Sequence, residues 1–253
     1  MVFKMKFILS LLFCASCIFV HAQDVNTLLK EASNFEKQFK EPEALEKYRQ
    51  AVYIDEKNIP ALVKCTELNC SIGARQTDKN AKNNYYQLAK TFAEKALSAD
   101  AANADANYAM ALVESKMIET ATENKEIADH IRQTKLYVDK ALAINPDQSK
   151  ANYIAGKWHY EMSNLNWLKK AAVKALYGLP KGDIDSAIIY MEKCKTLDQY
   201  FVRNYLDLAK AYQYKQQPAK EMDVLKKLVK LPTRTADDVA LKQEGEKMLN
   251  EML

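Results

Sequence analysis

The rarest side chains of this sequence gather between Gly156 and Pro180, in the stretch GKWHYEMSNLNWLKKAAVKALYGLP. Both tryptophans of the chain, Trp158 and Trp167, lie there with His159 and several lysines. Such crowding raises two alternatives. The stretch is either a binding or catalytic site, or the packed core of a helical array.

Enzyme motifs are missing from the sequence. It has no phosphate-cradling glycine loop, no nucleophile elbow and no metal-binding histidine pair. His130 and His159 are the only histidines after residue 22, and neither has acid or cysteine partners at metal-ligand spacing. The many carboxylates follow helical spacing, which is typical of solvated faces. We therefore predict a protein that is not an enzyme, with no catalytic residue, metal or cofactor.

The first residues resemble a secretory signal peptide. Lys4 and Lys6 precede an almost entirely apolar run that ends at Val20, and His21-Ala22 offers a small residue for cleavage. We predict a signal over residues 1–22, cut between Ala22 and Gln23, and an exported protein, periplasmic or extracellular. The alternatives are an uncleaved anchor, although the run is shorter than a membrane span, and a lipoprotein cut before Cys17.

Charge and cysteine content restrict what the remaining chain does. Loss of two lysines with the signal lowers the net charge from +4 to +2, which leaves no electrostatic footprint for nucleic acid. Three cysteines remain, Cys65, Cys70 and Cys194, and an odd number excludes a full disulfide framework. Five residues of helix turn Cys65 about 140° away from Cys70. We expect all three thiols to be buried and unbridged.

Helices must position all of these residues. The chain has only five glycines and six prolines, and every proline lies at a boundary between segments rich in Ala, Leu, Lys, Glu and Gln. No segment alternates long enough for a strand. We predict an all-α fold, with residues 23–253 forming a single domain.

One helical hairpin recurs along the chain. ADANYAMALVESKM (Ala104–Met117) aligns without a gap with SKANYIAGKWHYEM (Ser149–Met162), at an offset of 45 residues. The unit resembles the tetratricopeptide repeat, a helix–turn–helix with small residues where its helices approach. Five hairpins are expected to begin near the following residues: Val25, Ile59, Ala104, Ser149 and Val202.

Two further helices complete the predicted right-handed superhelix. The fourth hairpin carries an inserted helix over about residues 165–177, stopped by Gly178 and Pro180. After Pro232, a terminal helix capped by Thr235 shields the last hairpin, because each repeat contacts only its neighbours.

The spacing of the insertion resembles the helical domain of the regulator of microtubule dynamics family. The matching residues are Gly156, Trp158, Tyr160, Leu165, Trp167, Leu168, Ala172, Leu176, Gly178 and Pro180, followed by KLVKLPTRTADD later in the chain. The resemblance implies a superhelix of repeat-like hairpins. It also associates the eukaryotic members with microtubules or membrane contacts, and the helical groove with phospholipid. The secretory signal directly before the repeats departs from those members, so we expect no microtubule binding here.

The resemblance to the repeat also implies a ligand-binding concave face, carried by positions 2, 5, 9 and 12 of each first helix. The candidate residues are Tyr108, Leu112, Lys150, Tyr153, Lys157, Tyr160, Arg203, Leu206 and Lys210. Tyrosine beside lysine suits a peptide carboxylate, or an anionic head group with apolar tails. The alternative is an ordinary wet groove with partly packed aromatic rings.

The rare residues of the opening stretch then become packing residues. His159, at position 11 of the repeat, is expected to face the partner helix. Trp158 is expected to be a packing residue, and Trp167 to pack in an apolar stripe, with membrane-surface docking as its alternative. Two functions remain open. One is a protein-interaction scaffold that binds a peptide or a partner's helix in the groove, and the other is a carrier of phospholipid or another apolar ligand.

Overall fold

The computed structural model describes residues 24–164 and 177–253. The expected signal peptide over residues 1–22 lies outside the described residues. So do Trp167 and the inserted helix expected over 165–177, except for its last residue.

The described residues form helices, turns and short loops, with no strand among them. A first helix covers residues 24–37. The others are α2 (Glu41–Ile54), α3 (Ile59–Ala74), α4 (Lys79–Ala99), α5 (Ala104–Met117), α6 (Asn124–Ile144), α7 (Ser149–Ser163), α9 (Ile184–Leu197), α10 (Val202–Tyr214), α11 (Pro218–Leu228) and α12 (Asp238–Asn250).

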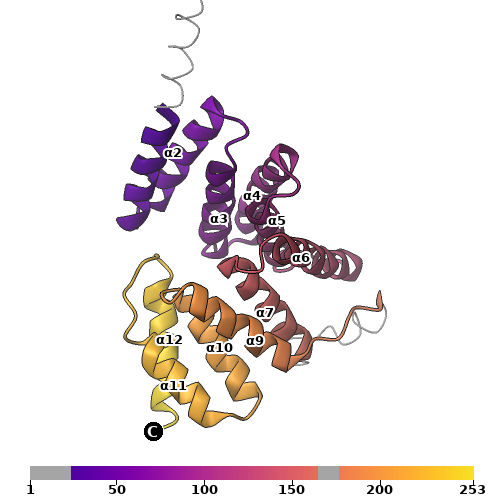
Figure 1. The fold of residues 1–253 in the computed structure, drawn as a ribbon, viewed down its shortest axis with the longest axis vertical. Coiled ribbons are helices and arrows are strands. Elements are labelled where there is room, and N and C mark those ends of the chain that lie inside the picture. Colours follow the sequence, from indigo (N-terminus) through magenta and orange to yellow (C-terminus); the bar gives the residue numbers. More distant parts are fainter. Residues whose placement is uncertain (1–23, 165–176) are drawn as a thin grey trace, which may run out of the picture.

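Five antiparallel hairpins follow one another along a curved array (Figure 1). The repeat register is confirmed, since α3, α5, α7 and α10 begin at the expected residues Ile59, Ala104, Ser149 and Val202. Three of the prolines occupy the first turns of α2, α3 and α11, where the missing N–H has no helical partner to lose. The right-handed sense of the superhelix stays a prediction.

Small residues let the two helices of a hairpin approach. Ala89, Ala93 and Ala96 of α4 are fully buried. In the fourth hairpin Gly156 takes the small position, and a Cβ added there would lie 2.6 Å from the Met191 Cγ and 3.0 Å from the Ala187 carbonyl oxygen of α9. Larger side chains at these positions would push the helices apart.

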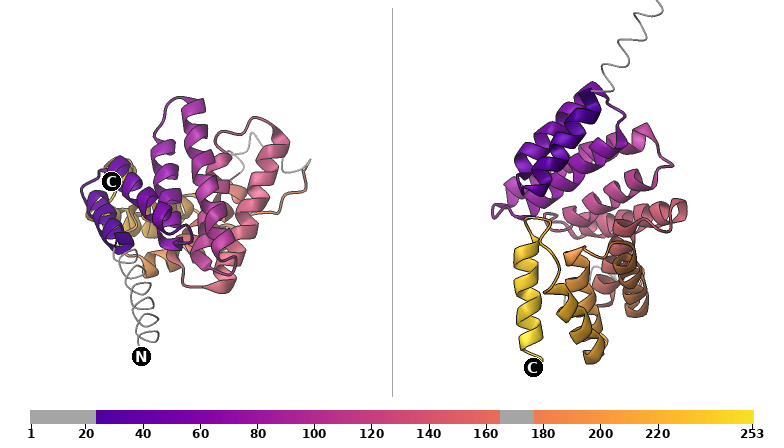
Figure 2. Two further views of the ribbon diagram at one scale, coloured as in Figure 1. Left: turned by 90° about the horizontal axis from the view of Figure 1, so that it is seen from above. Right: turned by 60° about the vertical axis from the view of Figure 1, so that its left-hand side comes forward.

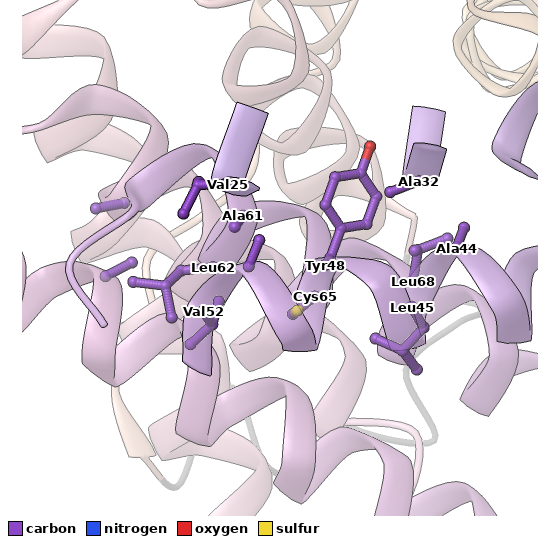
Figure 3. Close-up of a cluster of buried hydrophobic side chains, with 13 residues drawn as sticks. Val25, Ala32, Ala44, Leu45, Tyr48, Val52, Ala61, Leu62, Cys65 and Leu68 are labelled. Atoms are coloured by element: carbon purple, nitrogen blue, oxygen red, sulfur yellow. The ribbon is translucent and has the colours of Figure 1, made fainter. Parts of the chain in front are cut away.

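The first hairpin shares an apolar core with α3. Figure 3 shows the ring of Tyr48 extending from α2 toward Ala32, with Leu62 and Cys65 of α3 in the same cluster. Cys65, Cys70 and Cys194 are all buried and free, as expected. Burial raises the pKa of each thiol to about 12.

The repeated Asn-Tyr pair has a structural reason. Asn107 donates from its side-chain amide to the carbonyl oxygens of Ala101 and Asn103, at 2.9 and 2.8 Å. Asn152 donates in the same way to Pro146 and Gln148, at 2.9 Å each. Each asparagine therefore ties the turn before a hairpin to its first helix.

The terminal helix α12 begins later than the sequence indicated. Thr235 is not its N-cap. Instead the Asp238 carboxylate accepts the N–H groups of Arg234 and Thr235, at 2.7 and 2.9 Å, and the Thr235 hydroxyl at 2.6 Å. The loop thus folds back onto the helix end, and α12 packs against α10 and α11, which confirms its capping role.

The array curves until its two ends meet. In Figures 1 and 2 the loop before α12 lies beside the end of α3. Arg75, directly after α3, donates to Asp237 of that loop at 2.8 Å. None of the helices over the described ranges is long and apolar enough to cross a bilayer.

Candidate functional site

The first helices of successive hairpins line the inner face of the curve. α3 contacts α5, α5 contacts α7, and α7 contacts α10. Charged side chains from these four helices meet in two clusters, one around Glu67 and one around Asp207.

The Glu67 cluster joins three hairpins. The Glu67 carboxylate accepts the Lys150 ammonium at 2.6 Å and the Tyr108 hydroxyl at 3.0 Å, and Lys64 lies 3.4 Å away. Burial would raise the pKa of Glu67, but Lys150 and Lys64 outweigh it and lower that pKa to about 2. The cluster extends to Glu36, which accepts both Lys64 and the Tyr48 hydroxyl.

The Asp207 cluster joins α7 to α10. Tyr153 donates its hydroxyl to Asp207 at 2.7 Å, and the Lys157 ammonium lies 3.5 Å from the same oxygen and 3.2 Å from Glu161. Burial opposes charge on both Asp207 and Lys157. Their mutual attraction outweighs burial, so the pKa of Asp207 is lowered and the pKa of Lys157 is raised well above its ordinary value.

The predicted tyrosines and lysines therefore have different environments. Tyr108 and Tyr153 are buried, at 4% and 5% exposure, and their hydroxyls are committed to carboxylates. Lys150 and Lys157 keep about a third of their side chains exposed, at 34% each. The lysines present a reachable surface, and the tyrosines hold the acids that orient them.

The predicted groove residues of the fifth hairpin contact the C-terminal segment, which buries Leu206 and forms ion pairs with the partly exposed Arg203 and Lys210. Leu206 is 1% exposed in the core shared with α12, so it cannot meet a ligand there. Lys210 pairs with Glu244 of α12 at 2.8 Å, and Arg203 with Asp237 at 2.7 Å. The apolar end of the array needs a cap, and the cap occupies these positions.

A pocket of about 370 Å³, counting space open to solvent, lies between α5, α6 and α7. Its lining is Ser115, Ile118, Ile131, Thr134, Ile154, Lys157, Trp158, Glu161 and Met162. Most of these side chains are apolar, and Lys157 and Glu161 supply the charge. Lys157 thus belongs both to this pocket and to the Asp207 cluster.

The remaining two candidates lie beside these features. Leu112 is half-buried and packs between neighbouring core clusters. Tyr160 is half-buried and meets Tyr214 edge to face, with ring centroids 6.2 Å apart.

Trp158 and His159 are packing residues, as expected. The buried Trp158 donates its indole N–H to the Ile131 carbonyl at 3.1 Å. His159 stacks on Tyr190 of α9, and its Nδ1 accepts the Asp183 N–H at 3.3 Å. Burial, and then Lys135, lower the pKa of His159, which favours the neutral ring.

Sequence reasoning missed the carboxylates of the inner face. Glu67 stands at position 9 of the second hairpin, so extending the repeat register to that hairpin would have found it. Asp207 stands one place beyond position 5 and carries no such signal. His130 was likewise missed as a partner of the buried Glu114, at 2.5 Å between its Nδ1 and the carboxylate. No group of three potential metal ligands occurs in the parts of the chain that the structure describes.

Comparison with known proteins places the chain in a family. The model of "Regulator of microtubule dynamics protein 1-3" matches residues 28–253. The chain belongs to the regulator of microtubule dynamics family. Bovine regulator of microtubule dynamics protein 3 is 26% identical over 173 residues, which cover 68% of this chain and 36% of that protein. Human regulator of microtubule dynamics protein 2 is 25% identical over 179 residues, or 70% of this chain and 43% of its own length.

The chain thus spans about a third to a half of these two relatives. Among solved structures, a tetratricopeptide-repeat protein of Thermus thermophilus superposes with a TM-score of 0.63 at 12% identity, covering 89% of this chain and 99% of its own. This likeness confirms the tetratricopeptide-like fold that the sequence predicted.

Proposed function

We propose that this regulator of microtubule dynamics family member is a non-enzymatic scaffold, which binds a peptide or helix of a protein partner on its inner face. The tetratricopeptide-like fold supports this role. The observation that carries it is the pair of partly exposed lysines, Lys150 and Lys157, which pair with the largely buried carboxylates of Glu67 and Asp207 on the first helices.

The geometry of these lysines suits peptide recognition. Each ammonium group has three donors. Lys150 gives one to Glu67, and Lys157 shares its donors between Glu161 and Asp207. About a third of each lysine side chain is exposed, and we propose that the remaining ammonium donors bind carbonyl or carboxylate oxygens of a partner. The buried acids fix both lysines in place, which reduces the entropy lost on binding.

Affinity capture tests this function. The tagged full-length chain is cross-linked in its own cell extract, and bound proteins are compared for the wild type, Lys150→Gln/Lys157→Gln and a control, Lys95→Gln. Lys95 is exposed on α4, a second helix. We expect a specific partner with the wild type and control, and a severalfold weaker signal with the double variant at unchanged melting temperature. Equal capture by all three would refute inner-face binding.

Export is part of the proposed function and rests on the signal-like residues 1–22. A fusion of residues 1–40 to alkaline phosphatase should be active only outside the reducing cytoplasm, and Lys4→Glu/Lys6→Glu should reduce that activity. An unaltered fusion without activity would place the protein inside the cell.

Microtubule binding is not included in the proposal. The two relatives are named for microtubule dynamics, but this chain matches less than half of either one. We expect no co-sedimentation of the purified chain with polymerised tubulin. Saturable co-sedimentation with microtubules would contradict this expectation and indicate that this protein also binds microtubules.

A second candidate function is the binding of an apolar ligand, such as a phospholipid chain, and the pocket between α5, α6 and α7 favours it. Ile131, Ile154 and Trp158 contribute apolar surface to it, and Lys157 and Glu161 supply charge at its side. Native mass spectrometry of the purified chain should then reveal a bound lipid. Delipidated protein that acquires nothing from anionic vesicles would eliminate this candidate.

A further inference from the structure

Two arginines from distant parts of the chain converge on one carboxylate. Arg75, at the end of α3, donates to Asp237 at 2.8 Å, and Arg203 of α10 donates to the other oxygen of Asp237 at 2.7 Å. Asp237 lies in the loop directly before α12, where the two ends of the array meet (Figure 2). Two guanidinium groups around one carboxylate make a geometrically specific anion site.

The contact is exposed enough to be exchanged. Arg75 and Arg203 retain 37% and 36% side-chain exposure, and Asp237 retains 20%. Ion pairs at this exposure contribute little net stability, because water and salt compete for both partners. α12 itself is anchored on α10 and α11, so losing this contact does not remove its packing.

We propose that Arg75 and Arg203 form a binding site for a carboxylate of an acidic partner peptide, and that Asp237 occupies this site in the free protein. The inference rests on the proposed scaffold function and names one chemical feature of the partner. A carboxylate from the partner replaces the carboxylate of Asp237, and the charge around the two arginines stays the same.

The local charges favour a carboxylate over a phosphate. Arg75 also binds Glu41 of α2, and Arg203 lies within electrostatic reach of Asp207. Glu41 and Asp207 remain when Asp237 leaves. They would repel a doubly charged phosphate more strongly than a singly charged carboxylate.

A probe peptide tests the site in the full chain. Fluorescein-labelled hexaglutamate with an amidated C-terminus is titrated at low ionic strength, and binding is read as fluorescence anisotropy. We expect Asp237→Ala to tighten binding at least about fivefold, which corresponds to about 1 kcal/mol of removed competition. Asp223→Ala, at an exposed site of α11, is the matched control and should change nothing.

The arginines must account for the gain. Arg75→Gln and Arg203→Gln, each added to Asp237→Ala, should return binding to the wild-type level or below. A Gly-Ser peptide with a free C-terminus carries only a terminal carboxylate, so comparing its binding with that of amidated hexaglutamate shows which kind of carboxylate the site prefers. Hexalysine tests whether binding requires negative charge. No gain in Asp237→Ala, or a gain that survives loss of both arginines, overturns the proposal.

Folding and function are controlled separately. Melting temperatures and far-ultraviolet circular dichroism identify variants that fail to fold. If an arginine variant fails to fold, hexaglutamate binding to Asp237→Ala is measured in high salt instead. The tighter binding should then disappear, and tighter binding that persists in high salt overturns the proposal. The two proposals can fail separately. If partner capture depends on Lys150 and Lys157 but Asp237→Ala does not change hexaglutamate binding, this site is rejected and the scaffold function is retained.

Discussion

At the scale of single residues, the inner face is organised around largely buried acids, which accept hydrogen bonds from the tyrosines that the sequence highlights. Glu67 receives Lys150 and Tyr108 and lies close to Lys64, so it joins helices that are far apart along the chain. Its lowered pKa means that the folded state favours the ionised form more strongly than the unfolded chain does.

The Glu67→Gln variant should lose stability in a pH-dependent manner. With a folded pKa of about 2 against an ordinary value of 4.5, the stabilisation is fully present above pH 4.5 and disappears as the pH falls toward 2. We expect a loss on the order of 1–3 kcal/mol at neutral pH, because two lysines lose their counter-charge. Urea unfolding of the wild type and variant between pH 7 and pH 3 measures it.

The matched control is Glu56→Gln, in the exposed turn between α2 and α3. It should leave stability nearly unchanged. A difference between the wild type and Glu67→Gln that stays constant down to pH 3 would contradict the assignment of ion pairing to Glu67.

At the scale of helices and turns, a single asparagine explains why the Asn-Tyr pair recurs at an offset of 45. Asn107 and Asn152 each donate to two carbonyl oxygens of the preceding turn. Both side chains are buried, at 1% exposure. A buried amide that satisfies turn carbonyls cannot be replaced by a carboxylate of the same shape, since the carboxylate has no N–H to donate.

The Asn152→Asp variant should destabilise the protein strongly, although the two side chains have nearly the same shape. It places a carboxylate against the Pro146 and Gln148 carbonyls, and we expect a loss of about 2–4 kcal/mol. Thermal unfolding at neutral pH measures the change. Asn124→Asp, exposed at the start of α6, is the control and should be neutral or slightly stabilising through the helix dipole. Equal effects at both positions would show that the turn contacts carry little energy.

At the scale of the whole molecule, partly exposed ion pairs join the second and fifth hairpins to the loop before α12. Arg75 binds Glu41 and Asp237, and Arg203 binds Asp237 from the other end. Tetratricopeptide-like arrays contact mainly neighbouring repeats, so a contact between residues 162 positions apart restricts the array as a whole.

Loss of this contact should open the array. Spin labels at Thr77 and Ala236, both exposed near the junction, report the separation of the two ends. Arg75→Gln should shift and broaden the distance distribution measured by pulsed electron resonance, and high salt should do the same to the wild type. Lys247→Gln, which removes an exposed ion pair at the end of α12, is the control. A distribution unaffected by Arg75→Gln would show that packing alone sets the curvature.

Local sequence patterns predict the helical class, the register of the hairpins and the cores between neighbouring hairpins. Helix propensity, proline positions and the spacing of small residues act locally, so they can be read along the chain. Ile59, Ala104, Ser149 and Val202 begin helices as predicted. Cys65 and Trp158 are buried for the same reason, since each faces the next helix of its own or the adjoining hairpin.

The exposure of each inner-face side chain depends instead on how the hairpins and α12 pack against one another. Lys210 follows the same repeat register as Lys157, yet its ammonium pairs with Glu244 of α12, and α12 also packs over the core that contains Leu206. The pairing of Lys150 with Glu67, and of Arg75 with Asp237, depends on how the small rotations between hairpins accumulate along the array. The accumulated rotation brings charged residues that are distant in the sequence together, and no local sequence pattern predicts these pairs.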